Sequence, residues 1–286
     1  MKLKALILNS FAHESKGGNP AGLVLNADNL THDQKLALAS KIGVSETAFV
    51  SESKIADFKL DFYTPTKQIA HCGHATVATF SYLRQLKQIN SLRSSKETVD
   101  GTREIFFQDS RAYMQQKAPS FHRVSEEEVE KIAQAMNIEA SQLLTHPEVV
   151  NTGNSFLIVH VEESLLKDMK PNLDLISAFS APYDLIAFYV FSFTNKEGFD
   201  ATTRMFGPYY GIPEESATGM AAGPLACFLD KYFFNDRNEY NILQGEYMPE
   251  PSPSHLHIRL EKSDGEISTL YAGGEAYISK ELTIEI

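Results

Sequence analysis

The chain has 286 residues, of which 43% are hydrophobic and 22% charged, a composition that is typical of globular proteins and excludes a disordered chain. Its formal net charge of −11 disfavours a nucleic-acid or anionic-membrane partner, because both are bound by clustered Lys and Arg. Two cysteines, Cys72 and Cys227, are too few for a disulfide framework and indicate a reducing compartment. The apolar run at residues 5–8 is too short for a signal peptide, and no run approaches the ~18 residues of a membrane span. We therefore expect a cytoplasmic protein.

The first part of the chain is rich in short apolar segments. Strands are predicted at residues 4–11, 23–25, 45–50, 58–63, 105–107 and 112–115. Residues 17–22 form a turn by their composition, and the polar residues 90–97 are predicted as a loop. Thr31 and Gln34 have the spacing of a capping box, so a helix is expected to begin here and to end at Gly43.

The composition changes near residues 118–124, where a second domain is expected to begin. Ser125 and Glu128 form another capping box, followed by apolar residues at helical spacing. Near-continuous apolar runs at residues 156–161 and 185–193 predict central strands. Further strands are predicted near residues 255–260, 269–272 and 275–279.

Residues 64–80 and 211–228 share one plan, in which a polar turn leads into a helix of small apolar residues. A helix that is apolar on every side must be buried, and its first N–H groups lack acceptors within the helix. Together with the helix dipole, these groups attract an anion. We therefore expect one central helix in each half, beginning near Gly73 and near Gly219, with an anion bound in a cleft between two similar domains.

Several motifs run in the same order as in one known family. They are residues 18–22 (GNPAG), 45–50 (SETAFV), 62–66 (FYTPT), 72–76 (CGHAT), 204–206 (RMF), 217–219 (ATG), 221–225 (AAGPL), 244–245 (QG) and 273–274 (GG). On these residues the chain resembles the phenazine-biosynthesis PhzF-like family, which has the diaminopimelate-epimerase fold. The resemblance implies an α+β architecture of two similar domains, each a β-barrel-like mixed sheet wrapped around a central helix. The first would cover residues 1–119 with a final strand at about 278–286, and the second residues 120–277.

The resemblance also implies proton transfer on a small carboxylic acid, with no metal or organic cofactor, in a protein that is usually a homodimer. Carried over by position, Glu46 is the acid/base, His74 a catalytic group at the first central helix, and Glu215 an orienting carboxylate or second base. Substrate contacts are expected from Asn19, Cys72, Gly73, Thr218, Gly219 and Met220, with backbone N–H groups of both helix starts holding the carboxylate. The predicted function is a cofactor-independent isomerase.

Four positions depart from the family's pattern and leave the substrate open. They are Glu215-Ser216 in place of Asp-Pro, Met220 where Ser is frequent, Glu250 in place of Arg, and Cys72 where the phenazine enzyme has Ala. Two other functions therefore stand beside the isomerase. In one, Cys72 and Glu215 act on opposite faces of the substrate in an amino-acid-type racemase or epimerase. In the other, the protein binds small carboxylates without catalysis.

Each candidate also has a plain structural interpretation. Glu46 fits an exposed carboxylate at the end of a strand, Glu215 a carboxylate that stabilises a helix start, and His74 a buried histidine that caps its own turn. A metal site is not expected, because His71, Cys72 and His74 lack the spacing of structural zinc ligands.

Overall fold

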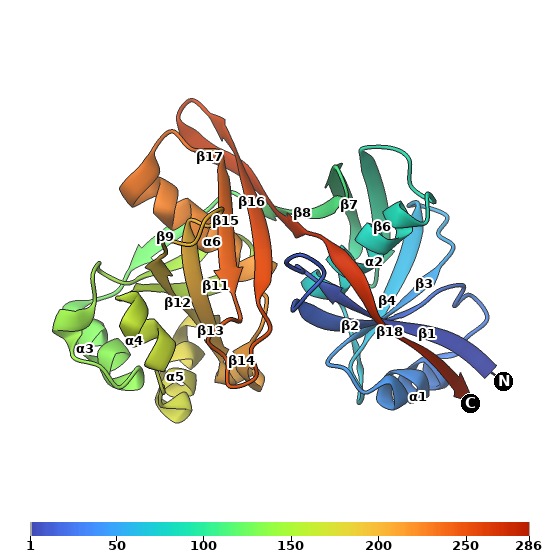
Figure 1. The fold of residues 1–286 in the computed structure, drawn as a ribbon, viewed down its shortest axis with the longest axis horizontal. Coiled ribbons are helices and arrows are strands. Elements are labelled where there is room, and N and C mark those ends of the chain that lie inside the picture. Colours follow the sequence, from blue (N-terminus) through green and yellow to red (C-terminus); the bar gives the residue numbers. More distant parts are fainter. Residues whose placement is uncertain (1, 286) are drawn as a thin grey trace. The chain divides into compact units, whose positions relative to one another are not determined.

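The structure, a computed structural model, describes residues 2–285. The chain divides into two compact units (Figure 1). Unit 1 comprises Met1–Gln115 and Gly273–Ile286, and unit 2 comprises Gln116–Ala272. The sequence predicts these boundaries slightly later, at residues 119 and 277. Both units contain strands and helices, as the predicted α+β class requires.

Unit 1 is a mixed sheet with two α-helices in its described part. Its elements are β1 (Lys2–Ser10), β2 (Asn19–Val24), α1 (His32–Ile42), β3 (Thr47–Ser51), β4 (Phe58–Tyr63), β5 (Gln68–Ile69), α2 (Gly73–Gln85), β6 (Arg93–Thr98), β7 (Gly101–Gln108), β8 (Arg111–Lys117) and β18 (Ala276–Glu285). Strand β1 pairs antiparallel with both β18 and β2, and β2 pairs parallel with β3. The register of β1 and β18 places Lys2 opposite Glu285, so the first and last described segments are neighbours (Figure 1).

Helix α2 is the central helix of unit 1 and begins at Gly73, as the sequence predicts. It packs against β1, β2, β3 and β18. Its residues from Ala75 to Ser81 are all buried. Helix α1 has the predicted capping box of Thr31 and Gln34 and ends at Gly43, whose φ of 75° is in the left-handed region that glycine adopts readily.

Two local predictions in unit 1 are wrong. Residues 19–22 are the first part of strand β2 rather than a turn. Most of the predicted loop at residues 90–97 belongs to strand β6, in which Ser94, Lys96 and Thr98 alternate inward and are buried. Polar side chains can point inward here because each has a hydrogen-bond partner, such as Asp57 for the Ser94 hydroxyl at 2.9 Å.

Unit 2 has more helices than predicted. Its elements are β9 (Ser120–Arg123), α3 (Glu126–Ala135), β10 (Glu148–Asn151), β11 (Ser155–His160), α4 (Glu163–Asp168), α5 (Leu173–Ser180), β12 (Leu185–Phe193), β13 (Ala201–Gly207), β14 (Ile212–Glu215), α6 (Gly219–Leu229), β15 (Glu239–Gln244), β16 (Ser254–Ser263) and β17 (Glu266–Gly274). Short 3-10 turns occupy Ala140–Gln142, Ala181–Tyr183 and Pro208–Tyr210, and a π-helical turn, Asp230–Phe234, follows α6. The predictions include α3 and α6 but omit α4 and α5.

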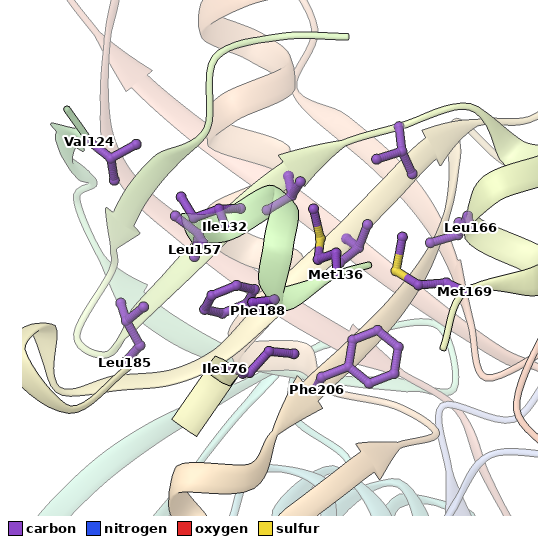
Figure 2. Packing of buried hydrophobic residues seen from close by; sticks show 14 of the residues in the cluster. Val124, Ile132, Met136, Leu157, Leu166, Met169, Ile176, Leu185, Phe188 and Phe206 are labelled. Atoms are coloured by element: carbon purple, nitrogen blue, oxygen red, sulfur yellow. The ribbon is translucent and has the colours of Figure 1, made fainter. Parts of the chain in front are cut away.

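The central strands β11 and β12 are parallel neighbours and are covered on both faces. One face meets α3, α4 and α5 in an apolar cluster that Figure 2 shows from close by. The labelled members are Val124, Ile132, Met136, Leu157, Leu166, Met169, Ile176, Leu185, Phe188 and Phe206. On the other face, the Phe191 ring packs edge-on against Phe228 of α6 with centroids 5.9 Å apart. This double covering explains the continuous apolar runs in the sequence.

Helix α6 is the central helix of unit 2 and begins at the predicted Gly219. Its residues Ala221–Leu229 are all buried, and it packs against β10, β11, β12 and β16. Pro224 lies inside the helix. Among the described helices, none combines the length and the apolar character that crossing a membrane requires.

Candidate functional site

The backbone of Glu46 is held by strand β2 immediately before β3 begins. The Gly22 N–H donates to the Glu46 carbonyl at 2.8 Å. Gly22 lies opposite Thr47 in the parallel register, and a Cβ at Gly22 would stand only 2.4 Å from Thr47 Oγ1. Glycine at this position therefore allows the two strands to approach closely enough to anchor Glu46.

Three side chains of unit 1 converge at the start of α2. His74 Nε2 lies 3.3 Å from Glu46 Oε2, and His74 Nδ1 lies 3.5 Å from the Cys72 sulfur. One polar atom from each of Glu46, Cys72 and His74 lies within 4.8 Å of the other two. Cys72 is buried, whereas the side chains of Glu46 and His74 are 23% and 12% exposed. A carboxylate, an imidazole and a thiol this close together can pass a proton among themselves or to a bound molecule.

The imidazole of His74 is disposed to remain neutral. Burial lowers the pKa of His74, against the opposing effects of the Glu46 carboxylate and of a hydrogen bond to the backbone of Pro20. A neutral imidazole beside a carboxylate can act as a hydrogen-bond donor to it without a fixed positive charge. Glu46 therefore has a partner that can orient its side chain while the histidine itself stays uncharged.

The titration of His74 is expected to have its midpoint below the ~6.5 of an unperturbed histidine. The midpoint should fall further in Glu46→Gln, because the carboxylate that favours the charged imidazole is then gone.

The lowered pKa also makes the stability of the protein depend on pH, because the folded form protonates His74 at lower pH than the unfolded chain does. The stability that His74 contributes is thus complete above ~6.5 and is lost as the pH falls. Histidine NMR, with His74→Gln to assign the resonance, measures the midpoint, and a value at or above ~6.5 would contradict the burial argument.

The first turn of α2 is open to an anion. Its N-cap residue, Cys72, makes no side-chain capping hydrogen bond, and Gly73 and His74 are only partly buried. Helix starts of this kind bind negative groups through their N–H groups and the helix dipole. Asn19, another predicted contact residue, is buried at the start of β2, where its carbonyl accepts from the Ser10 hydroxyl at 3.2 Å.

Glu46, Cys72 and His74 are also a set of possible ligands for a soft divalent cation, because their ligand atoms lie within 4.8 Å of one another. The local electrostatics oppose a cation, however. The positive end of the α2 dipole is at Cys72. The buried Lys96 ammonium hydrogen-bonds, at 2.6 Å, to Thr76 of the same first turns. This environment suits an anion better than a metal ion.

The remaining predicted site residues lie in unit 2, around the start of α6. Glu215 ends β14, and Thr218 is the N-cap of α6 without a side-chain capping bond. Glu215, Thr218, Gly219 and Met220 are all partly buried. The Asn154 side chain donates to the Met220 sulfur at 3.4 Å. The Met220 side chain is thus held as an acceptor where the family often has a hydroxyl donor.

Gln244 shapes this turn, a role that the sequence does not reveal beyond its Gln-Gly motif. The residue is completely buried. Its Nε2 donates to the Glu215 carbonyl at 2.7 Å, and its Oε1 accepts from the Thr218 N–H at 3.1 Å and from the Tyr189 hydroxyl at 2.9 Å. A single amide therefore fixes both ends of the segment that leads into α6.

Arg204 and Glu214 form a second support for the same segment. The guanidinium donates twice to the Glu214 carboxylate, at 2.7 and 2.9 Å, and also to the carbonyls of Leu166 and Met169, at 3.2 and 2.8 Å. Both side chains are nearly buried, with 6% and 11% exposure. Sequence motifs mark Arg204 but give no indication of this pairing.

Glu46, Cys72 and His74 thus lie together at the start of a buried helix in a fold of two α+β units. The family described as phenazine biosynthesis-like protein, PhzC-PhzF, matches residues 8–281. The chain therefore belongs to the PhzC-PhzF family and is an isomerase of that family, which confirms the predicted resemblance.

Individual relatives agree with this assignment. An uncharacterized isomerase of Clostridium acetobutylicum is 32% identical over 278 residues, which are 90% of each chain. The trans-2,3-dihydro-3-hydroxyanthranilate isomerase of Pseudomonas aeruginosa is 26% identical, over 96% of this chain and 99% of the relative. The crystal structure of a PhzF-family protein from Bacillus anthracis superposes with a TM-score of 0.90 at 26% identity, covering both chains completely. The predicted fold class is thereby confirmed.

Proposed function

We propose that the protein moves a proton on a small carboxylic acid by general acid/base catalysis, without a cofactor. The observation that carries the proposal is the convergence of Glu46, His74 and Cys72 at the uncapped start of α2. Glu46 is assigned as the acid/base, because its carboxylate is partly exposed and His74 lies beside it. The N–H groups of Gly73 and His74 are assigned to the substrate carboxylate.

Glu215, Thr218, Gly219 and Met220 are assigned to the same substrate by the resemblance, and this part of the assignment stays a prediction. The Gln244 and Arg204 contacts support it, since they hold the Glu215 segment in one conformation. The homodimer and the cleft also stay predictions.

A racemase or epimerase is the second candidate, because the Cys72 thiol lies within reach of the same site. A thiol can abstract a proton next to a carboxylate when it is ionised. The two candidates differ in outcome: the isomerase relocates a proton within the substrate, whereas the racemase returns it to the same carbon from the opposite face.

Solvent-deuterium exchange tests the function directly. The protein is incubated in deuterium oxide with trans-2,3-dihydro-3-hydroxyanthranilate and with a set of small amino and hydroxy acids, and each compound is followed by NMR. We expect one of them to gain deuterium at carbon. Deuterium at a new position supports the isomerase, and deuteration with inversion at the original carbon supports the racemase. A compound that binds by calorimetry without exchange would instead make the protein a carboxylate-binding member of the family.

A further inference from the structure

Strand β16 carries two histidines that neither the resemblance nor the proposed function uses. His255 and His257 are two residues apart, so their side chains point to the same face of the strand. Leu256 and Ile258, which alternate with them, are buried on the opposite face. Both histidines are only partly buried, so an ion in the solvent can reach them.

The imidazole rings of His255 and His257 lie against each other. Their centroids are 3.7 Å apart and their planes are inclined by 32°, whereas residues i and i+2 of a strand are roughly 6.5 Å apart along the backbone. The two side chains therefore lean toward each other. Two nitrogen ligands of a tetrahedral zinc ion, each at ~2.0–2.1 Å from the metal, stand ~3.3 Å apart. The spacing of the rings is close to the spacing that one shared ion requires.

Asn241 of the neighbouring strand β15 orients the His255 ring. It lies directly opposite His257 in the antiparallel register, and its Oδ1 accepts a hydrogen bond from His255 Nε2 at 3.0 Å. A neutral His255 that keeps its proton on Nε2 has its lone pair on Nδ1. Metal-binding histidines usually donate their other ring N–H to an oxygen acceptor in this way, which sets both the tautomer and the direction of the ring.

The surroundings of the pair also suit a bound cation. The Phe199 ring lies against His255 with centroids 4.5 Å apart, so His255 contacts an apolar neighbour as well as Asn241. The Asp200 carboxylate accepts from the Asn241 N–H at 2.8 Å and pairs with Arg237 at 2.8 Å. The positive charge of Arg237 is thus compensated by a carboxylate, which weakens its repulsion of a cation at the histidines.

We propose that His255 and His257 together bind one divalent transition-metal ion on this face of β16. Imidazole suits zinc, copper and nickel ions, whereas magnesium and calcium ions take oxygen ligands. Within residues 2–285, no Cys, Asp, Glu or further His completes a set of three with these two side chains, so water fills the remaining coordination positions. The inference goes beyond the proposed function and does not depend on it, because the ion has no part in the proton transfer.

Histidine NMR during a titration with zinc chloride tests this proposal. The histidines are isotopically labelled, and the variants His255→Gln and His257→Gln assign the two resonances. We expect both resonances to shift in parallel and to saturate with one zinc ion, whereas magnesium chloride should shift neither. In Asn241→Leu the half-saturating zinc concentration should rise ~10–100-fold, the usual cost of losing an orienting partner. In His255→Gln it should rise at least as much at His257, because a single imidazole then holds the ion.

A matched variant keeps the test specific. His122→Gln removes an exposed histidine from strand β9 of the same unit and should leave the half-saturating zinc concentration of the pair unchanged. Zinc bound at the start of α2 is recognised separately, by its effect on the His74 resonance. The proposal is overturned if His255 and His257 respond at different zinc concentrations in the parent protein. It is also overturned if His257 keeps the parent's midpoint in His255→Gln, and Asn241→Leu provides the comparison if that variant does not fold.

Discussion

Replacement of Glu46 by glutamine is expected to lower the rate of proton transfer by ~10²–10⁴-fold, which is the usual contribution of a general acid/base. Glutamine keeps the size of the side chain but cannot carry the proton. The backbone should not move, because its anchor is the hydrogen bond between the Gly22 N–H and the Glu46 carbonyl. The measurement is deuterium incorporation into the substrate identified by the exchange experiment, with calorimetry to show that the substrate still binds.

Glu52→Gln is the matched control for this variant. Glu52 follows strand β3 as Glu46 precedes it, and it is exposed. The Glu52→Gln variant should incorporate deuterium into the substrate at the same rate as the parent protein. If Glu46→Gln also exchanges at that rate, Glu46 is a strand-end carboxylate without a catalytic role, and the proton is carried by Cys72 or His74.

Replacement of Arg204 by methionine is expected to destabilise unit 2 by ~3–5 kcal/mol, the usual cost of breaking a buried ion pair from one side. Methionine fills much of the space but leaves the Glu214 carboxylate and the carbonyls of Leu166 and Met169 without their donor. Because the chain has two units, a single unfolding midpoint is not a safe measure. Amide hydrogen exchange in β13 and α6 reports on unit 2 alone.

Two companion variants identify the cause of this loss. In Arg204→Met with Glu214→Met, the uncompensated carboxylate is removed, so part of the stability should return. Lys131→Met breaks a solvent-exposed ion pair with Glu127 on α3 and should leave the protection of β13 and α6 unchanged. If Arg204→Met alone has no effect on exchange, the pair contributes nothing to the stability of unit 2.

Features governed by neighbours in the sequence could be predicted from it. The capping boxes at Thr31 and Ser125 are present because their partners lie three residues away. The starts of the two central helices are also marked locally, by glycine followed by small apolar residues. For Glu46 and His74, motifs indicated the residues, and the structure shows that they lie 3.3 Å apart.

The missed features depend on contacts between distant segments. Strand β6 has the composition of a loop, and Lys96 can occupy a buried position only because Thr76 and His71 supply acceptors from about 20 to 25 residues away. Gln244 likewise finds its partners 26 to 55 residues earlier. No local pattern records such pairs. Helix α5 is a different case, since its N-cap Asn172, which accepts from the Leu175 N–H at 3.1 Å, is a recognisable start signal.

The pairing of β1 with β18 has a consequence for biosynthesis. Unit 2 is continuous in sequence, whereas unit 1 is completed only by residues 273–286. Strand β18 therefore leaves the ribosome after all of unit 2, although it covers α2 together with strands made near the beginning. Domains fold as their residues become available during synthesis. Unit 2 can consequently reach its native state first, whereas the segments that carry Glu46, Cys72 and His74 belong to a sheet that stays incomplete until β18 has been made.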